Sequence, residues 1–590
     1  MKQLFILLLL AAICSTKICA QTGSDTTLNR EMLLEREYNP AIRDAQKIGS
    51  LPEINEQQSP RSTVEYSNYA APFNFKPAPS DMKPQVWMSD FNVSKNKGYL
   101  SGGVSTLLDF DAGAGYQVLD TWEDYLDFNL SFHSGNSTQN FLQAVDLKQK
   151  FKFADLLGGF NLRHDFDKIR LKANAEYTFS KYSLSHLRLD RQMKYFVDTA
   201  GIFDPENNLF QTSIGISSLE TEEFFYSANI RYNYFGQQYA AEDSSRLKEN
   251  NISLDWNFRK QTVPDNGLGL QGSLENFFYS SPDNFSASNG GLNQYTAVSL
   301  TPYYYIMSDK LDLSLGIKFD SEQGWQRKTR FAPAVRLNYN FNTPAQLYII
   351  AEGGRHNNSK YGIFYENRFA PPVHRIFDAH SPLDATVGIR FLPDKEVNIN
   401  LYAGYKITKE EHYFAPVFVA SDLVPNISSY NLDVLYGDES AIKAGGEIIY
   451  RFAGNLEIDL KGQYVHRNIE SDSFTTAMHK PNFEATANIT YKLSELPLNF
   501  DLSYRGLYGL KVSEYYTFIS PPSSSAYIPP YTTEIRMKDI HHASLKATYT
   551  FKTDLSFYVR LNNIFMQQYD IWYGYPAQDF SLMAGVSFLF

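Results

Sequence analysis

The chain has 590 residues, of which 15% are aromatic and 20% are charged, and its formal net charge is −11. The charges are spread along the chain, so the sequence lacks the basic patch that nucleic-acid binding requires. A mean hydropathy of −0.36 beside 41 Tyr and 43 Phe means that apolar side chains are diluted by polar ones almost everywhere, which disfavours a string of soluble domains.

The first segment, residues 1–20, has the features of a Sec signal peptide. Lys2 precedes an apolar run that ends near Ile13, and the small residue Ala20 marks the expected cleavage site. Both cysteines, Cys14 and Cys19, lie inside this segment, so the mature chain is expected to have no thiol. Lipidation of either cysteine is the alternative, which the large residue before each one disfavours. No later segment approaches the ~20 consecutive apolar residues of a helical membrane span.

Residues 21–97 differ in kind from the rest. Residues 27–48 could form a short helix interrupted by Pro40, and prolines are frequent beyond it. We interpret the segment as an arm that lies in the periplasm or in the lumen of a barrel. A disordered lead-in to the barrel is an equally good interpretation.

From residue 98 to residue 590, strands of alternating polarity recur. Charges on every second residue cannot face lipid, so the pattern predicts a transmembrane antiparallel β-barrel rather than a soluble sandwich. The residues expected to face lipid are Leu456, Ile458, Leu460, Leu555, Phe557 and Val559. The charged residues expected to face the lumen are Arg170, Lys172, Glu176, Glu457, Asp459, Lys461 and Arg560.

The connections alternate between short and long, which is typical of outer-membrane barrels. Counting strands on each side of every short turn gives about 22, an all-β fold. Short turns are expected near residues 167–168, 309–310, 393–395 and 553–554, and long loops over 184–210, 354–379, 409–438 and 510–538. Aromatic groups in the loops, at 361–365, 413–414 and 515–518, are assigned to the membrane-interface girdle in preference to a platform that stacks on a sugar or a fold over the barrel mouth.

The last strand, 580–590, places Phe588 and Phe590 on one face, and the chain stops on an aromatic residue. This ending resembles the signal by which outer-membrane proteins are handed to the barrel-assembly machinery. We therefore assign Phe588 and Phe590 to assembly.

No residues form a catalytic or cofactor-binding motif, so we expect neither enzymatic activity nor a cofactor. The candidate ligands of a metal ion are His356, His374, His380, His541 and His542. Neighbours in a strand point to opposite faces, and the other three histidines lack the spacing of a zinc site, so no metal is predicted.

The strand count and the long loops resemble those of TonB-dependent receptors over residues 98–590. The Leu-Glu-Arg-Glu-Tyr-Asn-Pro run at 34–40 and the Pro-rich stretch after it are similar to a Bacteroidota group of such barrels. A complete receptor carries a plug domain and a TonB-contacting box before its barrel. Here residues 21–97 are too few for that plug, and 62–66 is the nearest segment to a box.

The resemblance implies uptake of a nutrient across the outer membrane of a Gram-negative cell, after Sec-dependent export. The partners implied are outer-membrane lipid, the barrel-assembly machinery, and TonB, a surface lipoprotein or a periplasmic protein. A structural or accessory barrel in a surface complex and a passive porin are the alternatives. The lumen residues carry both signs of charge, so they do not identify a substrate.

Overall fold

The computed structural model describes residues 96–590 apart from positions 122, 145, 190–194, 198–203, 220–223, 239–245, 264, 281–293, 325–326, 371–376, 422–431 and 520–530. The chain divides into two units, 1–79 and 80–590, and every described residue belongs to the second. The predictions for the signal peptide, the arm and the 34–40 run therefore lie outside the described residues. Among the described residues, no helix has the length and apolar character needed to cross a membrane.

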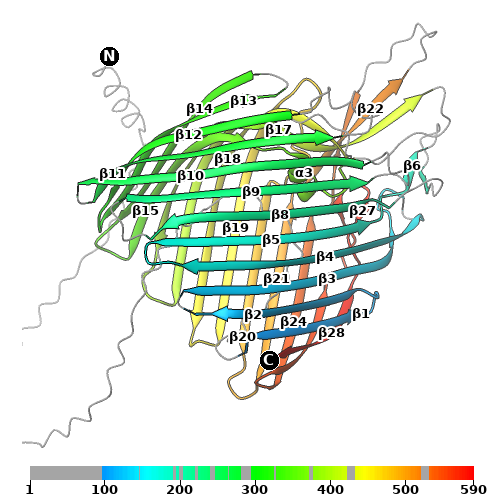
Figure 1. The fold of residues 1–590 in the computed structure, drawn as a ribbon. Helices are drawn as coiled ribbons and strands as arrows, with labels where there is room; N and C mark the ends of the chain where they lie inside the picture. The colour runs from blue at the N-terminus through cyan, green and yellow to red at the C-terminus, as the bar shows by residue number, and fades with distance from the viewer. Residues whose placement is uncertain are drawn as a thin grey trace, which may run out of the picture. The chain divides into compact units, whose positions relative to one another are not determined.

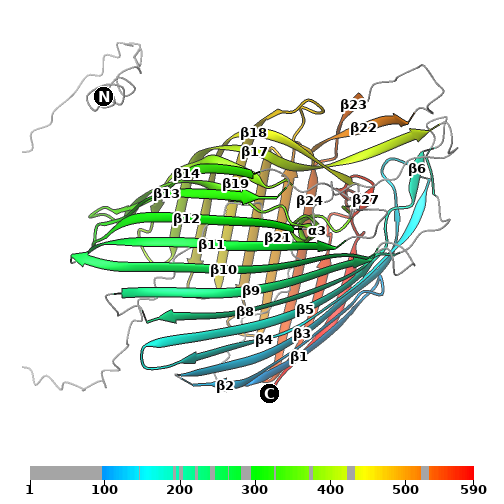
Figure 2. The ribbon, with the colours of Figure 1, turned by 45° about the horizontal axis from the view of Figure 1, so that its top comes forward.

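The second unit is a closed antiparallel barrel of 22 strands, as the sequence predicts (Figures 1 and 2). Each barrel strand pairs with the next along the chain, and β1 pairs with β28 to close the wall. The barrel strands are β1 (Gly98–Ser105), β2 (Phe110–Asp120), β3 (Asp124–Asn140), β4 (Lys148–Asp165), β5 (Ile169–Tyr182), β8 (Glu206–Ser218), β9 (Phe224–Gln238), β10 (Arg246–Val263), β11 (Asn266–Ser280), β12 (Gln294–Met307), β13 (Leu311–Gln323), β14 (Arg327–Asn340), β15 (Ala345–His356), β16 (Ala379–Phe391), β17 (Val397–Ser421), β18 (Leu432–Phe452), β19 (Leu456–Glu470), β20 (Phe483–Lys492), β21 (Leu498–Tyr508), β24 (Ile540–Lys552), β25 (Leu555–Asn562) and β28 (Ser581–Leu589).

The two ends of the barrel differ. The short turns predicted from the sequence connect strands at one end, here the turn end, where β1 begins and β28 stops. The longer connections lie at the other end, here the loop end. They contain the hairpins β6 (Leu187–Leu189) with β7 (Tyr195–Val197), β22 (Lys511–Ile519) with β23 (Tyr531–Arg536), β26 (Asp570–Trp572) with β27 (Tyr575–Pro576), and helix α3 (Lys360–Glu366).

Two of the predicted long loops are largely strand. Within 409–438, β17 continues to Ser421 and β18 starts at Leu432. Beyond Pro416, β17 leaves β18 and pairs in parallel with β22, which occupies part of 510–538. Backbone pairing continues past the barrel rim because it satisfies N–H and C=O groups regardless of side-chain polarity.

The seam between β1 and β28 is tightly closed. The Gly98 N–H donates to the Phe590 carbonyl at 2.7 Å, and the Phe590 N–H donates to the Gly98 carbonyl at 2.9 Å. Gly103 lies opposite Gly585, and the Tyr558 ring covers both, so a Cβ at either glycine would overlap that ring. Glycine is required here because an aromatic side chain lies against the backbone.

Substituting Ile458 by Arg is expected to cost ~2–4 kcal/mol of unfolding free energy if the side chain meets the bilayer midplane. The neighbouring substitution, Asp459→Arg, places the same group on the opposite face of β19 and is expected to cost much less. Denaturant unfolding of both variants in lipid vesicles measures the difference. Equal losses would contradict the assignment of the two faces.

Deleting Phe590 is expected to lower the yield of assembled, heat-modifiable barrel, because the deletion removes two seam hydrogen bonds and the stacking of Phe590 on Tyr116. The matched control is Phe551→Ala, which removes another exposed aromatic side chain near the turn end but away from the seam. Quantitative gel shifts of membrane fractions compare the two. A yield equal to that of the control would remove the role proposed for the terminal residue.

Candidate functional site at the loop end of the barrel

Helix α3 forms within the connection between β15 and β16. The Ser359 side chain caps its start by accepting a hydrogen bond from the Gly362 N–H at 3.0 Å. Asn367 ends the helix, and its N–H donates to the Ile363 carbonyl at 2.9 Å. The helix buries Lys360 and Ile363. It is a short, capped helix held mainly by contacts with the rest of the protein.

The α3 connection crosses the lumen from wall to wall. Arg368 pairs with Asp155 of β4 at 3.2 Å, and Glu366 pairs with His412 of β17. β4 is the fourth barrel strand and β17 the fifteenth, because β6 and β7 lie outside the barrel wall. Strands separated by half of a 22-strand ring lie on opposite walls. A connection bound to both walls therefore obstructs the loop end of the barrel.

A second connection, between β25 and β28, meets the first. Tyr575 of β27 stacks on Phe369 with ring centroids 3.8 Å apart and planes at 17°. Trp572 of β26 packs edge-on against Phe414 of β17 at 5.0 Å. Around these rings lies a buried apolar group, here called the mouth cluster, formed by Ile363, Ala370, Phe414, Leu432, Val434 and Tyr575.

A third connection, 471–482 between β19 and β20, supports the second. The neutral Nε2 of His479 accepts a hydrogen bond from the Tyr573 N–H at 3.1 Å. Lys480 pairs with Glu411 of β17 at 2.7 Å. Burial lowers the pKa of His479 to about 4, so the ring stays neutral and keeps its acceptor lone pair.

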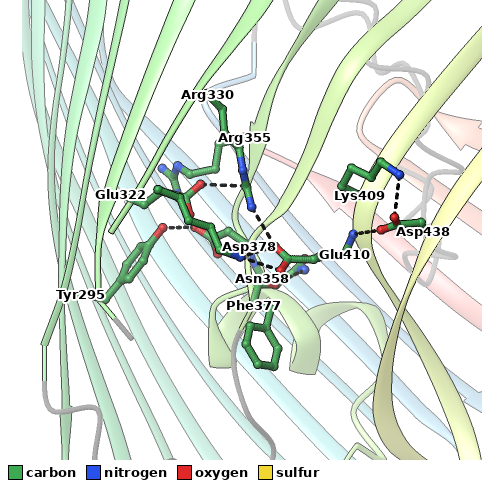
Figure 3. Close-up of polar contacts among 11 residues, drawn as sticks. Tyr295, Glu322, Arg330, Arg355, Asn358, Phe377, Asp378, Lys409, Glu410 and Asp438 are labelled. Carbon is green, nitrogen blue, oxygen red and sulfur yellow. Dashed lines mark hydrogen bonds and ion pairs between the residues drawn. The ribbon is translucent and has the colours of Figure 1, made fainter. Parts of the chain in front are cut away.

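An ionic network anchors the α3 connection to the wall (Figure 3). Arg355, at the end of β15, pairs with Asp378 at 2.7 Å and with Glu275 of β11. The Tyr295 hydroxyl of β12 donates to Asp378, and the Asn358 N–H donates to the same carboxylate at 3.1 Å. The side chains of Arg355 and Asp378 are only 7% and 1% exposed, so this pair is held by several charge-assisted hydrogen bonds away from water.

The network extends to β17 through one carboxylate. Glu410 accepts hydrogen bonds from Lys328 at 2.6 Å and from Arg330 at 2.8 Å, and Arg330 also pairs with Glu322 at 3.1 Å. Figure 3 shows Glu410 between this group and the Lys409–Asp438 pair. Both ends of the α3 connection are thus fixed, while its middle crosses the lumen.

Strands β3 to β9 carry a hollow of about 440 Å³ nearer the turn end. Its polar lining combines cations with amides and hydroxyls, from Tyr125, Asn161, Arg163, Arg170, Lys172, Asn174, Ser213, Ser217, Ser227 and Asn229. Arg170 and Lys172 were both assigned to the lumen from the sequence. Arg170 forms a two-point pair with Asp165 at 2.6 and 2.7 Å.

The other charged residues assigned to the lumen are spread around the wall. Glu457 pairs with Arg451 at 3.2 Å, and Arg560 pairs with Asp111 of β2 at 3.2 Å. Lys461 lies opposite Glu447, Asp459 lies opposite Ile449, and Glu176 lies opposite Gln211. They form no single cluster, and their facing remains a prediction.

The apolar residues assigned to lipid lie on two strands that are not adjacent. On β25, Phe557 and Val559 are 47% and 44% exposed, whereas the intervening Tyr558 is buried. Leu555 lies on the same face as these two, and on β19 Leu460 is exposed, with Leu456 and Ile458 alternating on its face. The C-terminal Phe588 and Phe590 are exposed and stack on each other. Contact of these faces with lipid remains a prediction.

The candidate histidines of a metal site have different partners. His356 contacts Ser381, and His380 lies opposite Arg355 in the pairing of β15 with β16. His541 contacts Tyr504, and His542 contacts Tyr569. His374 lies outside the described residues. Within the described ranges, no three His, Cys, Asp or Glu side chains gather as ligands of a metal ion.

The residues that close the mouth were largely missed by sequence reasoning. Phe414 was assigned with its neighbour Tyr413 to the interface girdle, but both side chains are buried among loop residues. The same holds for the 361–365 segment, where Ile363 belongs to the mouth cluster. The available signal was the high density of aromatic residues in the connections. Aromatic side chains stabilise a structure by burying apolar surface, which a solvated loop does not do.

Comparison with known proteins supports the barrel fold. No family model and no curated protein sequence matches the chain. The FrpB iron transporter of Neisseria meningitidis aligns with a TM-score of 0.62 at 11% identity, over 84% of this chain and 82% of its own. Pseudomonas aeruginosa FpvA bound to heterologous pyoverdines gives 0.59 at 12% identity, over 84% and 72%. The copper transporter OprC gives 0.57 at 11% identity, over 84% and 80%.

These neighbours are TonB-dependent receptors, so the predicted resemblance of the barrel is confirmed at the level of fold. Sequence identities this low establish a similar fold only. The substrates of the neighbours are therefore not assigned to this chain. The Bacteroidota group stays a prediction.

Acidification is expected to loosen the contact between the second and third connections. The folded pKa of His479, about 4, lies below the ordinary value of 6.5, so its contribution is complete above pH 6.5 and is lost as the pH falls towards 4. Amide hydrogen exchange over residues 569–577, corrected for the intrinsic rate, is expected to accelerate across this range.

The control variant is His479→Gln, whose side-chain oxygen can accept the Tyr573 hydrogen bond at any pH. The same pH range titrates Asp570, because burial raises the pKa of that carboxyl to about 6. The variant retains Asp570 and therefore isolates the histidine. Identical exchange profiles in the two proteins would exclude His479 as the cause.

Proposed function

We propose that this chain is an outer-membrane transporter that takes up a nutrient through its lumen, with the α3 connection and the β25–β28 connection acting as the gate at the loop end. The carrying observation is that the α3 connection is bound to opposite walls, at Asp155 and His412. A barrel of ~22 strands is wide enough to conduct ions freely when empty, so closure of its mouth matters for the membrane.

The structural neighbours support this direction. Their names record an iron transporter, a copper transporter and a ferric enterobactin receptor. We propose that the chain reaches the outer membrane by Sec-dependent export and the barrel-assembly machinery, and that TonB is its energising partner. A surface lipoprotein or a periplasmic protein remains the alternative partner. Passive diffusion fits less well, because the connections described here cross the mouth.

A cross-linking experiment tests the gate. The mature chain is expected to lack cysteine, so Arg368→Cys with Asp155→Cys introduces one addressable pair between the α3 connection and β4. In cells with this variant as the sole copy, joining the thiols with a short bifunctional reagent is expected to abolish uptake. Cell-associated iron and copper and depletion of organic solutes from the medium are measured, with and without the reagent.

The matched control joins two cysteines within the wall, at Glu447 and Lys461, which face each other on β18 and β19. It consumes the same reagent but leaves the gate unrestrained, so uptake should persist. Uptake that is unchanged by deletion of the gene would favour the structural barrel. A large steady conductance of the intact protein in planar bilayers would identify a passive porin and overturn the proposal.

A further inference from the structure

A row of lysines lies on the outer face of β4 at the loop end. Lys148, Lys150 and Lys152 occupy alternate positions and are all exposed. The intervening side chains point inward, since Gln149 is buried with its amide on the Leu184 carbonyl and Phe151 packs against the mouth cluster. Alternation along a strand therefore directs the three lysines away from the lumen.

The row continues onto neighbouring strands, which lie side by side in Figure 1. On β10, Leu247 and Glu249 are buried, which places Arg246 and Lys248 on the outer face. Lys181 of β5 lies at the same level as Arg246 of β10. In the strand register Lys181 is opposite Glu206 of β8, which is opposite Gln238 of β9. Gln238 is in turn opposite Arg246. These cations, Lys148, Lys150, Lys152, Lys181, Arg246 and Lys248, are here called the basic stripe.

The level of the stripe on the barrel is set by aromatic residues. Tyr177 is exposed on the face of β5 that carries Lys181, and it lies four residues closer to the barrel middle. On β8 the exposed Phe210 follows Glu206 in the same way, and Ile214 lies beyond it. Aromatic residues between charged and aliphatic ones mark the membrane interface. The basic stripe therefore lies at the level of lipid head groups.

Four of the six cations of the stripe have no partner carboxylate among the described residues. Lys181 pairs with Glu206 at 2.6 Å. Among the described residues, Lys148, Lys150, Lys152 and Lys248 have no carboxylate within 4.0 Å. At the loop end of β17 and β18 the outer face is different, because Lys409 is paired with Asp438 at 2.6 Å. These four lysines of the stripe thus differ from Lys409, whose charge is balanced by a neighbouring carboxylate.

We propose that the basic stripe binds the phosphate groups of lipids in the outward-facing leaflet. Closely spaced ammonium groups at the head-group level attract anionic lipid, and water-exposed sites of this kind weaken as salt screens them. Lysine side chains are flexible, so the ammonium groups can contact several phosphate groups without a rigid pocket. This inference concerns the outside of the barrel, so it holds or fails independently of transport through the lumen.

The test compares the full chain with a variant carrying Lys148→Gln, Lys150→Gln and Lys152→Gln. Both are reconstituted into phosphatidylcholine nanodiscs with a minor fraction of lipid A, and the lipid A retained on the protein is quantified by native mass spectrometry. Each lysine near an anionic surface contributes about a factor of five to binding, so the variant is expected to retain lipid A roughly 100-fold more weakly. The corresponding Lys→Arg triple variant is expected to bind as the wild type does.

The matched control, Lys511→Gln with Arg536→Gln and Lys538→Gln, makes the same change in net charge in the connection between β21 and β24. It is expected to retain lipid A normally. Heat-modifiability confirms that each variant is assembled. Equal retention by the stripe variant and the control would overturn the proposal. So would displacement of the lipid by inorganic phosphate at constant ionic strength, because that would indicate a site for the free anion.

Discussion

The structure depends on one constraint: a strand in the wall has to find partners for its backbone N–H and C=O groups on both sides. Each barrel strand meets this requirement with its sequence neighbours, and the two terminal strands meet it with each other. The paired Gly98 and Phe590 complete the wall, and the glycines beside Tyr558 leave room for its side chain against the joined backbones. Closure removes every free edge from the wall, and the width of the closed barrel grows with its number of strands.

The width creates a second requirement, which the loop end meets. A lumen enclosed by 22 strands exceeds what side chains of the wall can fill, so whole connections enter it. The α3 connection does so as a bridge, with ionic contacts at both walls and aromatic contacts at its centre. The ionic contacts fix the bridge at the two walls, and the stacked rings of Phe369 and Tyr575 give it a defined resting position between them.

The sequence was sufficient for the wall but not for the mouth. Alternation as regular as that of Leu555 to Asn562 predicts a strand and its two faces locally, because the side-chain period of a strand is two. The stacking of Phe369 on Tyr575 joins residues far apart in the chain, and no local pattern records it. The extension of β17 to Ser421 was also missed. The charged residues near 409–411 are typical of a loop, and the sequence does not show which strand pairs with them. Buried loop aromatics such as Phe414 were taken for an interface girdle for the same reason.

The parallel pairing of β17 with β22 has a mechanical consequence for the rim. β17 is the fifteenth barrel strand, while β22 lies in the connection between the nineteenth and the twentieth, so their five paired positions tie separated parts of the rim together. Such a strap resists dilation of the sector that it spans, because widening there shears a whole hydrogen-bonded row at once. The compliant side of the rim is then the one where strands are shortest, at β25, β28 and β1. Any object that stretches this barrel from within will deform it towards the seam.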